Sequence, residues 1–404
     1  MAELAHNLAR HIAGIDVGSN AIRLVIAQVS SQGALTVVET KRVPVRLGRR
    51  VFSDGEMDGE TVARAAQAFQ DFRHLMEHHH VQGFRAVATS ACREAGDQRE
   101  FLLRIESETG IKVEVIDAAE EARLIHLAVA AALKDSFPPR MILDIGGGSL
   151  ELSLVGKSGI MESTTLPIGT VRLMERHALY GAIEPSAAER LRKEVSAILD
   201  QSPAAGWKQV RSRVVATGGN AEELARLAPG TPQRGMGTLS LRSLEALIPK
   251  ILERDVAERM NAFGFRQDRS EVIGVAALIL STIGRRLGVN RFLVPGVGVR
   301  EGILSDLTAA GIPALGSESG LTLSSARNFA ERSGCSSRHF EHVRRLSLSL
   351  FDQLQGIHGL GGEMRQLLEL GAILHDVGHF IQQQLGVQVT LQVNQTPLVL
   401  AQGR

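Results

Sequence analysis

The chain has 404 residues, of which 44% are hydrophobic and 22% charged, so it is too long for one hydrophobic core and has the composition of a soluble globular protein. Its 45 basic and 44 acidic residues create no overall field that would attract nucleic acid, and an aromatic fraction of 4% argues against base-stacking surfaces. We therefore expect two or three domains, no nucleic-acid partner, and anion binding only at local sites.

The sequence also gives no indication of a membrane partner. It contains no run of about 18 apolar residues. The charged opening, MAELAHNLARHIAG, lacks the apolar segment of a signal peptide. Two cysteines, Cys92 and Cys335, cannot build a disulfide framework, which favours a reducing compartment. We expect a cytoplasmic protein.

Predicted strands and helices alternate in two similar halves, which meet near Pro138-Pro139. In the first half we expect strands at 11–15, 22–29, 84–89 and 113–116, and helices at 58–78, 97–109 and 117–134. In the second half we expect strands at 141–155, 160–166, 214–216 and 291–294, helices at 186–201 and 300–309, and a long helical region at about 242–288. After a Gly/Pro/Ser-rich linker, residues 322–382 are predicted to be wholly helical. This order predicts two α/β lobes followed by an α domain, with the ligand between the lobes.

Two glycine turns share one sequence pattern. Asp16-Val-Gly-Ser-Asn20 and Asp144-Ile-Gly-Gly-Gly-Ser149 each end an apolar strand in an acid and lead into a second strand. Glycine lets backbone N–H groups approach phosphate oxygens without a Cβ in the way, and the acid suits a hydrated divalent cation. One such turn alone is typical of an ordinary hairpin. Two of them predict duplicated lobes that face one ligand.

A third strand-to-glycine turn, Val215-Ala-Thr-Gly-Gly-Asn220, opens a predicted helix. It could cradle a phosphate at the helix N-terminus, or allow close packing of helix on strand. The turn at 294–302 is similar but less specific.

Of three charged residues, Arg93 and Glu121 have two interpretations each from the sequence alone, and Glu120 has one. Arg93 could hold a phosphate oxygen or lie on the surface. Glu120, three residues after Asp117, is most simply a capping residue. Glu121 lies about 100° further round the helix, where it could activate a water molecule or stabilise the helix N-terminus, and the residues alone favour the second role.

Two groups of histidines are weak metal candidates. His74 and His78 have helical spacing but no acid suitable for a metalloprotease-like site, so a histidine-rich helix end is the simpler interpretation. His375-Asp376 with a distant His342 could ligate a divalent metal. Because no acidic residue follows Asp376, the set is incomplete and the sequence argues against a metal site there.

Taken together, these segments resemble the exopolyphosphatase/guanosine pentaphosphate phosphohydrolase (Ppx/GppA) family of the sugar kinase/Hsp70/actin superfamily. The resemblance covers residues 12 to about 382 and is carried by IDVGSNAIRLVI (15–26), ATSACREAGD (88–97), IDAAEEARLI (116–125), ILDIGGGSLEL (142–152), LPIGTVRL (166–173), ATGGN (216–220) and PGVGVREGIL (295–304).

The resemblance implies an α/β fold with two ribonuclease-H-like (actin-like ATPase) lobes, an inter-lobe cleft, and a partial all-α HD-like domain. We expect the first lobe at 1–135, the second at 136–312 and the helical domain at 320–382. Residues 383–404 depart from the family pattern, because they carry no charge before Arg404.

The resemblance also implies roles for individual residues. Glu121 matches the catalytic base, and Asp144 with Asp16 matches the acids that place Mg²⁺. Phosphate binding is implied for Gly18, Ser19, Asn20, Arg93, Gly146, Gly147, Gly148, Ser149, Gly218, Gly219 and Asn220. In the kinases of the superfamily, the last three of these form the turn that contacts the nucleotide.

The implied function is Mg²⁺-dependent hydrolysis of the terminal phosphate of linear polyphosphate, with water activated by a glutamate. Guanosine pentaphosphate (pppGpp) is the alternative substrate, and a non-catalytic sensor of polyphosphate or (p)ppGpp is a second alternative. A sugar-kinase-like enzyme is weaker, since nothing marks a sugar pocket. The resemblance is compatible with a homodimer.

Overall fold

The computed structural model describes residues 10–30, 33–133, 138–156, 159–207, 210, 212–231, 236–309, 323, 326–327, 329–330, 333 and 335–377. The chain divides into two compact units, residues 1–312 and 313–404. The expected tail at 383–404 lies outside the described residues. Within them, no helix has the length and apolar character needed to span a bilayer.

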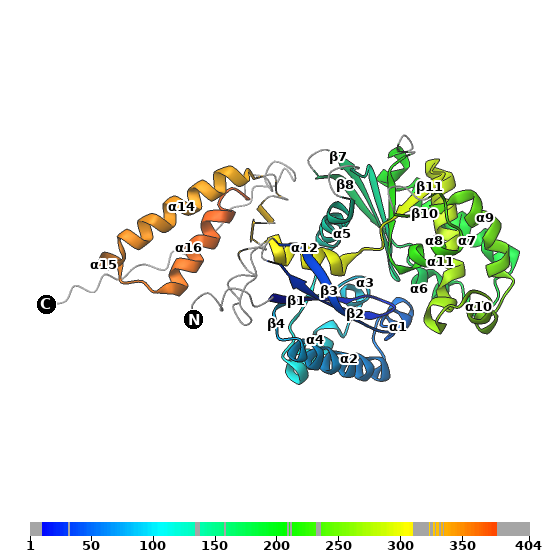
Figure 1. Ribbon diagram of the computed structural model, residues 1–404, viewed down its shortest axis with the longest axis horizontal. Coiled ribbons are helices and arrows are strands. Elements are labelled where there is room, and N and C mark those ends of the chain that lie inside the picture. The colour runs from blue at the N-terminus through cyan, green and yellow to red at the C-terminus, as the bar shows by residue number, and fades with distance from the viewer. Residues whose placement is uncertain are drawn as a thin grey trace. The chain divides into compact units, whose positions relative to one another are not determined.

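The first sheet has the strand order β3-β2-β1-β4-β5 (Figure 1). Its strands are β1 (Arg10–Val17), β2 (Ile22–Val29), β3 (Leu35–Val43), β4 (Val81–Ala88) and β5 (Val113–Val115). The first three form an antiparallel meander, and β4 and β5 then pair in parallel beyond β1. This lobe also contains the helices α1 (Gly48–Asp54), α2 (Gly59–His78), α3 (Ser90–Glu94), α4 (Gln98–Thr109) and α5 (Ala118–Leu133). Its apolar strand faces pack on Phe69 and Phe72 of α2 and Phe101 of α4.

The second sheet repeats this plan with the order β10-β11-β9-β6-β7-β8. Its strands are β6 (Met141–Ile145), β7 (Leu150–Gly156), β8 (Gly159–Leu166), β9 (Val214–Thr217), β10 (Gly237–Ser240) and β11 (Arg291–Val294). Again three antiparallel strands come first, and β9 then pairs in parallel with β6. Its helices are α6 (Thr170–Arg176), α7 (Pro185–Asp200), α8 (Gly219–Leu227), α9 (Leu241–Leu252), α10 (Val256–Phe263) and α11 (Gln267–Leu287). The helix α11 is buried on nearly all sides, which explains its long apolar run.

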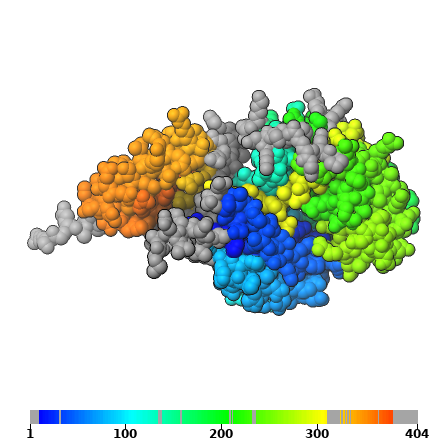
Figure 2. Space-filling view, viewed as in Figure 1, coloured from blue at the N-terminus to red at the C-terminus, as the bar shows by residue number. Residues whose placement is uncertain are grey.

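Two helices join the lobes. The last helix of this unit, α12 (Val299–Ala309), packs on α5 and on β1 of the first sheet, and both helices share one core with residues of both sheets. Figures 1 and 2 show α12 in yellow between the blue and the green parts of the molecule. At Gly302 a Cβ would lie 2.0 Å from the Leu124 carbonyl oxygen, so only glycine permits this close contact of the helices.

The structure confirms the α/β fold class and the two similar lobes. The region predicted as helical at 242–288 consists of three helices. A capping box of Asp255 and Glu258 begins α10, and Gly264, with a φ of 70°, ends it. The strand predicted at 84–89 is confirmed as β4, which ends at Ala88, and the short helices α1, α3 and α6 were not predicted.

The second unit is helical over its described residues, as predicted. It contains α14 (Ser337–Gln353), α15 (Gln355–His358) and α16 (Gly362–Leu374), of which α14 and α16 pack on each other. Its small buried apolar cluster consists of Ala326, Ala330, Phe340, Ile373 and Val377.

Candidate active site

The two glycine turns predicted from the sequence are equivalent hairpins. In the β1–β2 turn the Gly18 N–H donates to the Ala21 carbonyl over 3.2 Å, and in the β6–β7 turn the Gly146 N–H donates to the Ser149 carbonyl over 3.0 Å. The registers are equivalent as well. Asp16 pairs with Arg23 across the first hairpin, whereas Asp144 pairs with Glu151 across the second.

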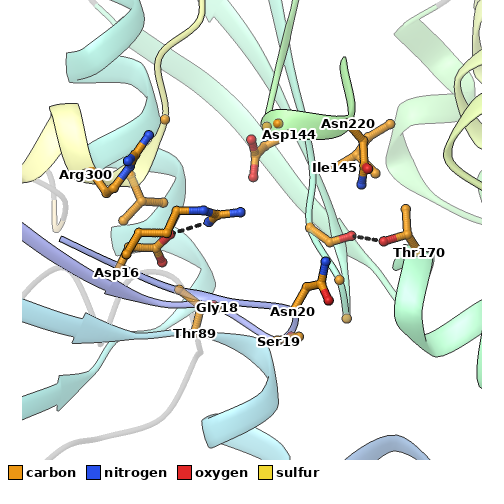
Figure 3. A pocket seen from close by; sticks show the side chains of 18 of the residues that line it. Asp16, Gly18, Ser19, Asn20, Thr89, Asp144, Ile145, Thr170, Asn220 and Arg300 are labelled. Carbon is orange, nitrogen blue, oxygen red and sulfur yellow. Dashed lines mark hydrogen bonds and ion pairs between the residues drawn. The ribbon is translucent and has the colours of Figure 1, made fainter. Parts of the chain in front are cut away.

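The tips of the two hairpins meet where the lobes face each other. A Cβ on Gly147 would lie 2.8 Å from Cβ of Ser19, a distance that real Cβ contacts essentially never show. A cavity of about 240 Å³ opens beside this contact and is lined from both lobes. Figure 3 shows the Asp16 and Asp144 side chains entering it from opposite sheets.

Nearly all of the predicted site residues are brought together here. The cavity is lined by Asp16, Gly18, Ser19, Asn20, Glu121, Asp144, Gly146, Gly147, Gly148, Ser149, Gly218, Gly219 and Asn220. Arg93 is not among the lining residues.

Glu121 enters the cavity from the first turn of α5 and is 6% exposed. Arg93 holds it, since the Nη1 of Arg93 donates to Oε2 of Glu121 and to the Ile116 carbonyl, each over 2.8 Å. Burial raises the pKa of the Glu121 carboxyl to about 7, an effect that Asp144 and Asp16 strengthen and Arg93 opposes. The carboxyl can therefore exchange a proton near neutral pH.

Three buried carboxylates converge at this point. Glu121, Asp144 and Glu151 each offer an oxygen, and these oxygens lie within 4.8 Å of one another. Burial raises the pKa of Asp144 to about 6, although Thr217 donates a hydrogen bond to its Oδ1. Burial and the charges of Glu121 and Asp144 raise the pKa of Glu151 well above its usual value.

The donor set fits a hard divalent cation. Among the described residues, neither buried oxygen of Glu151 has a hydrogen-bond partner. Ser149 lowers the pKa of Glu151, but by less than burial raises it. Uncompensated buried carboxylates are costly, and an all-oxygen set is what Mg²⁺ prefers. Asp16 lies outside this group, and its Oδ2 accepts from Nη1 of Arg23 over 2.7 Å.

The sequence model of the Ppx/GppA phosphatase family matches residues 25–310. The chain belongs to this family and is a phosphatase. An exopolyphosphatase 2 of Mycobacterium tuberculosis is 29% identical over 317 residues, which cover 73% of this chain and 98% of the relative. The crystal structure of an exopolyphosphatase-like protein is 28% identical, with a TM-score of 0.67 over 74% of this chain and 97% of that one. A Ppx/GppA member from Aquifex aeolicus is 27% identical, with a TM-score of 0.60 over 75% of this chain and 98% of that one.

The site of this Ppx/GppA protein also contains an arginine cluster that sequence reasoning missed. Arg23, Arg42 and Arg269 line the cavity. Arg42 pairs with Asp268 and Arg269 donates to Asn220, yet each keeps a buried Nε without a partner in the described structure. Burial, reinforced by Arg23 and Arg42, lowers the pKa of Arg269 to about 10. A cluster of arginines of this kind favours the binding of an anion.

Glu151 was also missed, although a signal existed. Glu151 is the one charged residue in the largely apolar strand segment LELSL. It lies directly opposite Asp144 in a tight hairpin, so the two carboxylates must share one environment. Arg42 had no such signal, because its partner Asp268 lies on a helix of the other lobe.

A buried ion-pair network fixes α5 next to Glu121. The Asp117 carboxylate accepts from the Glu120 N–H over 2.8 Å, while the Glu120 carboxylate itself pairs with Arg85 and Arg123. Both arginines also reach Asp306 on α12, over 3.1 and 2.8 Å. The helix that carries Glu121 is thereby tied to β4 and to α12.

Proposed function

We propose that this phosphatase hydrolyses the terminal phosphoryl group of linear polyphosphate, with Mg²⁺ as cofactor and Glu121 as general base. The observation that carries the proposal is the buried Glu121 carboxylate, which Arg93 holds with an oxygen within 4.8 Å of those of Asp144 and Glu151, at a cavity lined by the two glycine turns. We further propose action in the cytoplasm, where the free Cys92 and Cys335 would remain reduced.

Substrate binding is assigned to groups of both lobes. The N–H groups of Gly18 and Gly146 close the two hairpins, and the backbone N–H groups that follow them at 19–20 and 147–149 are the ones assigned to phosphate oxygens. Arg23, Arg42 and Arg269 supply positive charge to the same cavity. A chain of phosphates presents many negative oxygens in a row, which suits several separated cations better than a single phosphate does.

The reaction is an in-line displacement by water. Glu121 accepts one proton of the attacking water on a carboxylate oxygen while the water oxygen forms a bond to the terminal phosphorus. The bond from that phosphorus to the bridging oxygen breaks, and the shortened polyphosphate leaves with the electron pair. Asp144 and Glu151 would hold Mg²⁺, which supplies charge neutralisation on the phosphates when it is bound. Arg93 keeps the Glu121 carboxylate oriented toward the water.

The names of the relatives favour polyphosphate, and pppGpp is the alternative. A phosphate-release assay with long-chain polyphosphate and with pppGpp, each with and without Mg²⁺, tests this choice. We expect release from polyphosphate only when Mg²⁺ is present. Faster release from pppGpp would move the substrate to the guanosine compound, and release in EDTA would overturn the metal requirement.

The base is tested by Glu121→Gln, with the exposed Glu106→Gln on α4 as matched control. We expect turnover to fall by about 10²–10⁴-fold in the first variant and to stay unchanged in the second. Full activity of Glu121→Gln would exclude the proposed base. Binding of polyphosphate by the wild type without any turnover would instead indicate a sensor.

A further inference from the structure

The segment LPIGTVRL (166–173) connects β8 to α6 and holds the glycine turn at 146–149 from behind. Three consecutive carbonyls of the turn accept hydrogen bonds from residues 170–172. The Thr170 N–H donates to the Gly146 carbonyl over 3.1 Å, and the N–H groups of residues 171 and 172 donate to the next carbonyl, that of Gly147, over 2.8 and 3.0 Å. The third carbonyl, that of Gly148, accepts from a side chain instead, since Nε of Arg172 donates to it over 2.6 Å.

These contacts fix the direction of the N–H groups of the turn. In a trans peptide the C=O and the N–H of one peptide unit point in opposite directions. Because the carbonyls of residues 146–148 face α6, the N–H groups of residues 147–149 point the other way, on the side where the turn lines the cavity. Successive N–H groups on one side of a turn form a concave site for an anion. Gly169 permits this arrangement, because a Cβ there would lie 2.2 Å from the Gly147 carbonyl oxygen.

Arg172 is itself held by the first lobe. Its side chain is 12% exposed, and its Nη2 donates to Oε1 of Glu94 on α3 over 2.5 Å. Its Cζ lies 4.1 Å from the ring centre of Phe52 on α1, a cation–π contact. A guanidinium group is planar and keeps its donors in one fixed orientation. The contacts with Glu94 and Phe52 therefore also fix the direction in which Nε donates to Gly148.

We propose that Arg172 is a positioning residue for substrate binding: it holds the Gly148–Ser149 peptide so that the Ser149 N–H meets a phosphate oxygen. This inference rests on the proposed function, in which the turn at 146–149 binds the phosphates of the substrate. A charged donor on the carbonyl also polarises the peptide and makes its N–H a stronger donor. Arg172 is not among the residues that line the cavity, so it acts through the turn rather than on the phosphate itself.

Two simpler roles for Arg172 can be separated from this one by matched variants. The first is attraction of the substrate by charge alone, and the second is joining of the lobes. In Arg172→Lys a methylene group, Cε, takes the place of Nε and cannot donate, while a cation remains beside Glu94. In Glu94→Gln the ion pair between the lobes is removed, while Arg172 and its Nε remain.

The assay is the determination of kcat and KM for phosphate release from polyphosphate at saturating Mg²⁺. We expect KM to rise at least about tenfold in Arg172→Lys, because the bound substrate loses a well-oriented, charged hydrogen bond. Glu94→Gln should raise KM less, since Glu94 is 44% exposed and the pair is weak. The control Arg176→Lys, at an arginine of the same helix that pairs with Glu194, should keep the wild-type KM. A purely structural defect would lower the active fraction, and hence kcat, without changing KM.

A wild-type KM in Arg172→Lys would overturn the proposal. A rise in Glu94→Gln as large as that in Arg172→Lys would also overturn it, because joining of the lobes would then explain the effect. Calorimetric titration with tripolyphosphate repeats the comparison without turnover, and Arg172→Lys should bind at least about tenfold more weakly than the wild type. If the wild type bound tripolyphosphate but released no phosphate, the proposed hydrolysis would fail and the titration would still test Arg172. Equal binding by the two proteins would exclude the role of Arg172 and leave the hydrolysis intact.

Discussion

Replacing Arg93 is the most direct test of what sets the pKa of the proposed base, Glu121. It is the cation that donates to the Glu121 carboxylate, over 2.8 Å, and the side chains of Arg93 and Glu121 are 22% and 7% exposed. Unit charges about 4 Å apart interact by ~4 kcal/mol at an effective dielectric constant of about 20. Such a neighbour lowers the pKa of a carboxyl by about 1–3.

Replacing Arg93 with glutamine should therefore raise the pKa of Glu121 from about 7 to roughly 8–10. Glu121 acts as a base only when it is ionised, so the fall in activity on the acidic side should move to higher pH. At pH 7 the ionised fraction would drop from about one half to roughly 10% or less. Activity near pH 9 should recover much of this loss.

The assay is the pH profile of kcat/KM for phosphate release from polyphosphate at saturating Mg²⁺. The control is Arg104→Gln, which removes an exposed arginine paired with Glu108 on α4 and should leave the profile unchanged. A profile of Arg93→Gln with its acidic limb at the wild-type pH and a raised KM would refute the reasoning. Arg93 would then contact phosphate directly, as the family resemblance implies.

Further predictions concern the contact of the hairpins and the support of the base. Gly147→Ala should lower kcat/KM for phosphate release with little loss of folded protein, because its Cβ would lie 2.8 Å from that of Ser19. Asp306→Asn should lower the free energy of unfolding in urea by about 1–3 kcal/mol, because it removes one charged hydrogen-bond acceptor from the buried Arg85 and the half-buried Arg123. Wild-type stability of this variant would show that Glu114 and Glu120 together satisfy both arginines.

The sequence predicted the parts of the site that lie on one short stretch of chain. Each glycine turn follows its own strand, so Asp16, Asp144 and the glycines could be located from local pattern. Their meeting could be predicted because the turns are duplicated. The position of Glu121 in the cavity depended on the family resemblance, since its own segment equally suited a helix N-terminus.

The parts that could not be predicted depend on contacts between distant segments. Arg42 lies on β3 and Asp268 on α11, and only the closed pair of lobes brings them together.

The two hairpins have the same backbone arrangement but carry different charges. At the equivalent cross-strand position, the first hairpin has Arg23 and the second has Glu151. Arg23 neutralises Asp16 through a 2.7 Å ion pair, so the first hairpin itself adds no spare negative charge to the cavity. Glu151 instead adds a second carboxylate beside Asp144, and burial together with the charges of Glu121 and Asp144 raises the pKa of Glu151. If both hairpins had glutamate at this position, they would repel the substrate. If both had arginine, neither hairpin would leave a carboxylate free to bind the metal. The exchange of arginine for glutamate at one register position therefore gives the two hairpins opposite charge, while Arg269 of the second lobe and Glu121 of the first lobe bring the opposite sign to each side of the cavity.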